Sequence, residues 1–161
     1  TEHKLSVVDN ARLFAYLNMA MADALIAVFE SKYAFNTWRP VTAIRGADIA
    51  RNKNIKADAT WEPLLVTPPH PEYGCAHCVA AGSAVGVIRK FSGGDKISAN
   101  FIYPTLGILR QWNSLDQIAR EMEDARVWGG VHFRTAAEHG TRVGRQIAEY
   151  GLNAYLQPVN N

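Results

Sequence analysis

The sequence predicts an all-α protein built as a helical bundle, and three observations favour this fold class. Apolar side chains in residues 9–31 recur at helical spacing, and the remaining faces of this segment are also largely apolar. Residues 114–117 and 135–138 both fit Ser/Thr-x-x-Glu/Gln, the capping-box pattern of a helix N-terminus. No segment alternates convincingly between polar and apolar residues, so no strand is expected.

The first predicted helix covers residues 9–31 and is expected to be buried in the bundle. It must end by Trp38, because Pro40 disfavours the α conformation of the residue before it. Residues 41–74 contain a polar stretch followed by a proline-rich stretch, and both are interpreted as loop. The apolar positions of the helix are Leu13, Leu17, Met21, Ala24 and Val28.

Three further helices are expected after this loop. The helix over residues 75–91 is rich in Ala, Gly and Ser, which permits a neighbouring helix to approach closely, and Ser-Gly-Gly-Asp ends it. Helices over 115–127 and 136–156 follow the two capping patterns. Since no repeat or linker is visible, residues 1–161 are expected to form a single domain.

Composition and charge exclude several classes of protein. The chain has 161 residues, of which 48% are hydrophobic and 20% charged, as expected of a folded domain and not of a disordered tail. A net charge of +2 with no run of Lys or Arg predicts no nucleic-acid partner. The longest apolar run is interrupted by Asp23, so no membrane span is expected. The protein is expected to be soluble, with its compartment left open.

Residues 67–78, TPPHPEYGCAHC, leave several kinds of site open. Cys75 and Cys78 could form a local disulfide or stay as free buried thiols. A zinc site would need two further ligands, for which His70 and Glu72 are the near candidates. A Cys-x-x-Cys redox site would need a βαβ context, which the helical pattern does not provide.

Three short segments carry the residues expected to bind an anion. Lys32 and Arg39 lie seven positions apart, and His77 stands at the start of a predicted helix, where free N–H groups favour negative charge. Arg126 and His132 flank a Gly-Gly pair. Any one of these residues alone is more often an ordinary surface side chain. If they converge, the three cations match the charge of a phosphate-like anion.

In order and spacing, these segments resemble the three signature motifs shared by type-2 phosphatidic acid phosphatases and vanadium-dependent haloperoxidases. Lys32, Arg39 and Pro40 reproduce the first motif, and residues 74–77 and 125–136 align with the second and third. The flanking stretches WRPVTAIR, TPPHPEY and GGVHFR are similar to the soluble haloperoxidase-like branch. The resemblance covers about residues 9–156.

The resemblance implies an all-α bundle with a single phosphate- or vanadate-type anion pocket. His132 would ligate vanadate, or act as the nucleophile of a phosphatase, and His77 would be the catalytic acid or base. His70 stands where bromoperoxidases tend to carry a histidine and is assigned to halide or substrate. The implied cofactor is vanadate, or phosphate in its place. The anion-binding set is Lys32, Arg39, Cys75, Ala76, His77 and Arg126.

Four motif positions depart from the family pattern. Cys75 and Ala76 replace Ser and Gly of the second motif, and a thiol is a weaker donor than a hydroxyl. Ala125 replaces a serine, and Ala136 replaces the aspartate that orients the ligand histidine. Glu138 is assigned to the second capping box and not to that missing role. A weakened anion site is therefore expected.

Three functions follow from this resemblance. The first is vanadate-dependent oxidation of halides, bromide or iodide before chloride, by hydrogen peroxide. The second is an acid phosphatase that acts on small phosphoesters through a phosphohistidine. The third is a non-catalytic member that binds an anion or a protein. Because the relatives are usually longer, residues 1–161 are expected to be the C-terminal part of a longer chain, packed on a missing N-terminal segment or on a second copy in a homo-oligomer.

Overall fold

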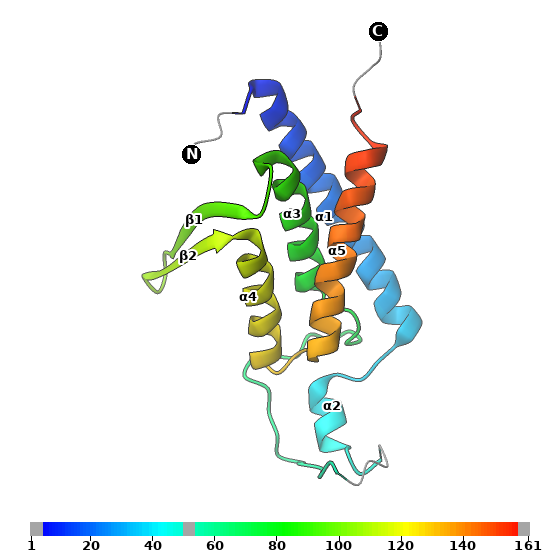
Figure 1. Ribbon diagram of the computed structural model, residues 1–161. Helices are drawn as coiled ribbons and strands as arrows, with labels where there is room; N and C mark the ends of the chain where they lie inside the picture. Colours follow the sequence, from blue (N-terminus) through cyan, green and yellow to red (C-terminus); the bar gives the residue numbers. More distant parts are fainter. Residues whose placement is uncertain (1–4, 50–53, 158–161) are drawn as a thin grey trace.

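A computed structural model describes residues 5–49 and 54–157, which form a helical bundle with one β-hairpin at its side (Figure 1). Long helices α1, α3 and α5 run side by side, and α4 packs on α3 and α5. The helical bundle is confirmed, but the expectation of no strand was wrong. The helices are α1 (Val7–Phe35), α2 (Pro40–Arg45), α3 (Ala76–Ser92), α4 (Leu115–Trp128) and α5 (Arg134–Ala154).

Helix α1 is longer than predicted because both of its ends are capped. The Ser6 side chain accepts a hydrogen bond from the backbone N–H of Asp9, which satisfies a free donor of the first turn. Asn36 ends the helix in the left-handed conformation, with φ of 46°. The face that packs on α3 and α5 buries small residues, Ala20 and Ala24, together with Val28.

Helices α3 and α5 approach each other so closely that only glycine fits at the crossing. A Cβ atom at Gly82 would lie 2.2 Å from the carbonyl oxygen of Thr141, and one at Gly144 would lie 2.1 Å from that of Val79. Both distances are far below van der Waals contact. The close approach predicted from the small residues of α3 is therefore present.

The two predicted capping boxes have different outcomes. The Ser114 side chain accepts from the backbone of Gln117, whose own side chain reaches back, so the box that starts α4 is confirmed. The second box was wrong, because α5 begins at Arg134 with Phe133 as a cap that makes no side-chain hydrogen bond. Glu138 lies inside α5 and has no capping role.

The hairpin joins α3 to α4 and projects from the bundle (Figure 1). Strand β1 (Lys96–Tyr103) pairs antiparallel with β2 (Ile108–Ser114), and Ala99 faces Trp112. Residues 100–103 of β1 and 108–111 of β2 are all exposed. The strands therefore lack the buried face that produces a clear period of two, which explains why the sequence did not predict them.

One further expectation needs correction. Part of the predicted loop 41–74 is helical, because Pro40 stands at the first position of α2, where proline is favoured. The expectation of no membrane span stays a prediction: among the described residues, Val7–Arg45 contains a stretch with a mean hydropathy of 1.5 that is long and apolar enough to cross a membrane. A single helix of this kind is weak support for a membrane span, since core helices meet the same criterion.

Candidate functional site

A pocket of about 250 Å³ brings together four of the side chains expected to bind or process an anion. His70 reaches it from the loop before α3, and His77 lies in the first turn of α3. Arg126 comes from the last turn of α4, and His132 from the connection to α5. The rest of the lining is mainly apolar and consists of Leu25, Phe29, Pro68, Ala76 and Ala80.

His132 is buried and held through both ring nitrogens. Its Nδ1 lies 2.9 Å from a carboxylate oxygen of Glu72, and its Nε2 lies 3.2 Å from an Arg39 nitrogen. A guanidinium can only donate hydrogen bonds, so Nε2 must be the acceptor. Nδ1 must then carry the proton of the ring and donate a hydrogen bond to Glu72. Burial is the main cause that lowers the pKa of His132, although Glu72 acts in the opposite direction. The ring is thus neutral, with the Nε2 lone pair exposed to donors.

Arg39 stands behind the pocket and connects its two inner histidines. Its side chain is 6% exposed and donates to the carbonyl oxygens of His70 and Val131. One guanidinium nitrogen lies 3.0 Å from Nδ1 of His70, and another contacts His132. Nδ1 of His70 also lies 3.3 Å from the carbonyl oxygen of Pro71, which can only accept, so these two contacts do not assign the tautomer of His70. Arg39 therefore fixes the orientation of both rings.

Lys32 does not point a free ammonium into the pocket. The side chain is fully buried, and Nζ donates to the carbonyl oxygens of Pro71, Glu72 and Gly74 at 3.1, 3.1 and 2.6 Å. These three contacts use the three donors of an ammonium group. Burial, followed by the charge of Arg39, lowers the pKa of Lys32 to about 8. In this structure Lys32 fastens the loop before α3.

Arg126 is the cation of the motifs with unused hydrogen-bonding capacity. Its Nε is buried and has no hydrogen-bond partner. Burial lowers the pKa of its guanidinium, and the charge of Arg126 helps, after burial, to lower the pKa of His77. A buried donor without an acceptor is costly unless a ligand supplies one. An oxyanion in the pocket would supply it.

The cysteines of the second motif form a disulfide, one of the alternatives that the sequence left open. Both residues are fully buried, and the Cys75 sulfur accepts a hydrogen bond from the backbone N–H of Cys78 at 3.2 Å. A disulfide sulfur has no S–H, so the expectation that the Cys75 side chain donates to an anion was wrong. Cys75 is instead the N-cap of α3, next to Ala76 and His77. The first N–H groups of α3 have no acceptor within the helix.

Glu72 is the residue of this site that the sequence reasoning missed. It was considered only as a zinc ligand, yet its carboxylate is 3% exposed and contacts His132. The signal was present in two places: an acidic residue two positions before the second motif, and alanine at position 136 in place of the expected aspartate. Ala136 itself is buried and contributes a carbonyl contact to Cys75 N.

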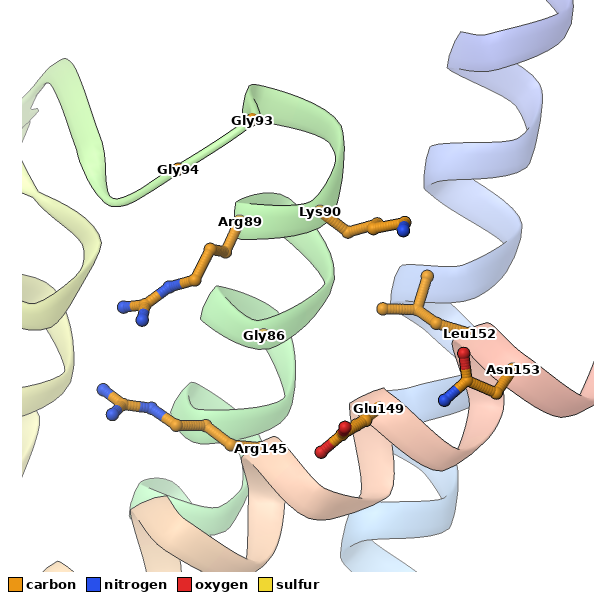
Figure 2. A pocket seen from close by; sticks show the side chains of 9 residues that line it. All are labelled: Gly86, Arg89, Lys90, Gly93, Gly94, Arg145, Glu149, Leu152 and Asn153. Atoms are coloured by element: carbon orange, nitrogen blue, oxygen red, sulfur yellow. The ribbon is translucent and has the colours of Figure 1, made fainter.

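The remaining part of the described chain offers no equivalent site. A larger hollow of about 570 Å³ between α3 and α5 is lined by Arg89, Arg145 and Glu149 among others, away from the motif residues (Figure 2). Each of its two arginines donates to Asp116 at 2.6 Å, although Nε of Arg145 is buried without a hydrogen-bond partner, as Nε of Arg126 is. Its lining includes no histidine, so it lacks the acceptor nitrogens of the smaller pocket. Within residues 5–49 and 54–157, no group of three His, Cys, Asp or Glu side chains could hold a metal cation. An oxyanion needs no such cluster, because cations and N–H groups hold it.

Comparison with known proteins places this chain in a family. Residues 12–161 match the model of the VCPO second helical-bundle domain. The chain belongs to this haloperoxidase-like family. It is 31% identical over 94 residues to the vanadium chloroperoxidase of Curvularia inaequalis, a match that covers 53% of this chain and 15% of that protein.

Solved structures agree with the fold. A bacterial vanadium-dependent iodoperoxidase superposes with a TM-score of 0.76 at 34% identity, over 88% of this chain and 32% of the other. An apo-type bacterial vanadium-dependent chloroperoxidase gives 0.69 at 23% identity, over 86% and 35%, a level that supports the fold alone. The chain spans about a third of the length of these proteins.

Proposed function

We propose that this chain binds vanadate, or phosphate in its place, between Arg126 and His132, and that it belongs to an enzyme that oxidises halides with hydrogen peroxide. The proposal rests mainly on Arg126, whose Nε is buried without a hydrogen-bond partner. Arg126 lines the same pocket as His132, whose Nε2 is a hydrogen-bond acceptor. Membership of the haloperoxidase-like family supports the same ligand.

The proposed roles follow from the contacts of each side chain. His132 would be the ligand through Nε2, once the hydrogen bond that its lone pair accepts from Arg39 gives way to the anion, and Arg126 would pair with the oxygens of the anion. The backbone N–H groups at the start of α3, at Ala76 and His77, would donate to the anion in place of the serine hydroxyl that Cys75 lacks. Vanadate, when bound, supplies a centre that activates peroxide; the protein supplies the positive field, the orientation and an apolar wall.

His77 and His70 are proposed to handle protons and the second substrate. Desolvation is the main cause that lowers the pKa of His77, so its ring is neutral at pH 7 and can accept a proton. His70 contacts the ring of Phe29 edge-on, with 5.2 Å between centroids, at the apolar side of the pocket. A weakly hydrated halide such as bromide or iodide is proposed to enter there.

Phosphatase activity is the second candidate, because one observation favours it directly. A phosphohistidine forms only on an unprotonated ring nitrogen, and Nε2 of His132 is held in that state by Arg39. A small phosphoester would then occupy the same pocket. Activity assays on both reactions separate the candidates, and anion binding without turnover in either would identify a non-catalytic member.

Calorimetric titration with phosphate and with vanadate tests the proposed site. We expect binding in the micromolar to millimolar range, weakened at least about tenfold in R126A, because the charged hydrogen bonds to the anion are lost. R134A is the matched control, since Arg134 is paired with Asp124 on the bundle surface. Equal binding by R126A and the natural protein would exclude this site. Bromide oxidation with vanadate and peroxide then tests the activity.

We further propose that residues 1–161 act as one bundle of a longer protein. The matching family model describes a second helical bundle, and the relatives are about three times as long as this chain. Helix α1 carries a row of exposed apolar side chains, including Phe14 and Ile26, that another bundle could cover. A second copy of the chain is the alternative partner.

A further inference from the structure

Within residues 5–49 and 54–157, the buried carboxylate of Glu72 accepts hydrogen bonds from the segment that holds His132. One oxygen, Oε1, accepts from Nδ1 of His132 at 2.9 Å and from the backbone N–H of Phe133 at 3.0 Å. The side chains of Glu72 and His132 are 4% and 2% exposed. A charge this deeply buried is normally retained only where it has specific partners. Both of its partners here fix the position of one imidazole ring.

The loop that carries Glu72 is itself held rigidly. Lys32 binds the carbonyl oxygens of residues 71, 72 and 74, and the backbone N–H of Glu72 donates to Thr37 at 3.1 Å. The carboxylate is therefore positioned from α1 and from the segment that follows it. The ring that it orients belongs to the opposite end of the chain, just before α5.

We infer that Glu72 is the positioning residue of His132, and that it performs from the loop before α3 the task that the family pattern gives to position 136, where this chain has alanine. The inference rests on the proposed role of His132 as the ligand of the anion. Its geometric part does not, since the contact exists without any anion. Glu72 acts through His132 and touches no substrate itself.

The chemical consequence is a fixed tautomer. Glu72 accepts a hydrogen bond from the Nδ1–H of the neutral ring, so the lone pair must lie on Nε2, next to Arg39. A carboxylate on the far nitrogen also makes Nε2 a stronger electron donor. Without Glu72, donation from Arg39 would still favour a lone pair on Nε2, but the Nδ1–H would lose its acceptor and the ring one of its two anchoring contacts.

A second consequence concerns Ala136. Nδ1 has one N–H, so it can serve one carboxylate, and Glu72 already occupies it. An aspartate added at position 136 would place a second buried negative charge beside the first. We therefore expect A136D alone to bring no gain in vanadate affinity, and to become useful only when Glu72 has been neutralised.

Nitrogen-15 NMR of the histidine ring tests the geometric part in the protein without anion. We expect His132 in the Nδ1–H tautomer in the natural protein, and a pKa for its ring that falls in E72Q, because the carboxylate that favours the charged ring is gone. Glutamine keeps an oxygen that can accept both hydrogen bonds, so E72Q is expected to fold. An Nε2–H tautomer in the natural protein would overturn the inference even if no variant could be made.

Vanadate titration tests the functional part with four proteins. E72Q should bind vanadate about 10- to 100-fold more weakly, the usual effect of losing such a partner, and E72Q/A136D should recover most of that loss. E138Q is the matched control, because Glu138 is an exposed carboxylate on the same helix as Ala136, and it should bind as the natural protein does. Unchanged affinity in E72Q, or no recovery in the double variant, would overturn the role of Glu72. Failure of the natural protein to bind vanadate would instead overturn the proposed function and leave the tautomer result standing.

Discussion

The three motif cations differ in how much of their hydrogen-bonding capacity is left for a ligand. All three N–H donors of Lys32 bind carbonyl oxygens. Arg39 is hydrogen-bonded to His70, Val131 and His132. Arg126 retains a buried Nε without a partner. The positive field of the pocket thus comes from three residues, whereas direct pairing with an anion is assigned to one of them.

Replacing Lys32 by methionine should therefore act on stability as well as on the pocket. Methionine fills similar space but leaves three carbonyl oxygens without their charged donor, so we expect a loss of at least about 3 kcal/mol in the free energy of unfolding. K90M is the control, since Lys90 is exposed in the last turn of α3. Urea unfolding measures both. A K32M protein as stable as K90M would show that the loop before α3 does not depend on these bonds.

Protonation of the three histidines of the pocket should link stability to pH. Burial lowers the pKa values of His70, His77 and His132 in the folded state. The unfolded chain then binds more protons as pH falls below about 6.5, so the free energy of unfolding should decrease with acidification between pH 7 and 5. This window lies above the ordinary pKa values of Asp and Glu. The free energy of unfolding of H132N should depend less steeply on pH than that of the natural protein. An identical slope in urea unfolding would exclude His132 as a source of the pH dependence.

The sequence identified most of the site because its motifs place residues by local spacing. His77, Arg126 and His132 do line one pocket, and Arg39 does reach it. The contribution of Glu72 was missed despite the sequence signals at positions 72 and 136, because its partner His132 lies 60 residues away and only the fold brings the two together. The three carbonyl oxygens that Lys32 binds were missed for the same reason, since they lie about 40 residues further along the chain.

At the level of elements, the sequence predicted correctly a helix start that depends on local hydrogen bonds. It did not predict the element boundaries and strands that depend on tertiary contacts. The capping box of Ser114 satisfies free N–H groups wherever it occurs, and it marked the start of α4 correctly. Residues 135–138 fit the same Ser/Thr-x-x-Glu/Gln pattern, but α5 begins before them, at Arg134. The hairpin of β1 and β2 was missed because its outer part has no buried face to impose a period of two.

The crossing of α3 and α5 gives a direct test at this scale. G144A would place a Cβ atom 2.1 Å from the carbonyl oxygen of Val79 and 2.7 Å from the backbone nitrogen of Ser83, so the helices must move apart. We expect a destabilisation of about 3 kcal/mol. In G94A the new Cβ atom meets nothing within 4 Å, and the change should stay within about 0.5 kcal/mol. Thermal unfolding of both variants provides the comparison, and equal melting temperatures would contradict the close crossing.

For the molecule as a whole, the exposed side of α1 is the least explained surface. Val7, Phe14, Leu25 and Phe29 are all exposed apolar residues, and their spacings of 7, 11 and 4 place them on one side of a helix. Leu25 and Phe29 also line the candidate pocket. A partner that covers this face would therefore close one wall of the pocket, which connects the proposal of a longer protein to the proposed anion site.

The isolated chain should then associate through this face. We expect sedimentation to show concentration-dependent assembly of the natural chain, since exposed apolar area of this extent is normally buried in a contact. F14E/I26E should stay monomeric and folded, because it places one charge within the row of Val7, Phe14, Leu25 and Phe29 and a second beside that row, at exposed Ile26. L64E/V66E is the control, as these two residues are exposed in the loop before α3.

If assembly covers the pocket wall formed by Leu25 and Phe29, vanadate affinity should also rise with protein concentration in the natural chain and in the control, but not in F14E/I26E. A natural chain that remains monomeric at every concentration, with the same vanadate affinity as F14E/I26E, would show that this face is not a docking surface.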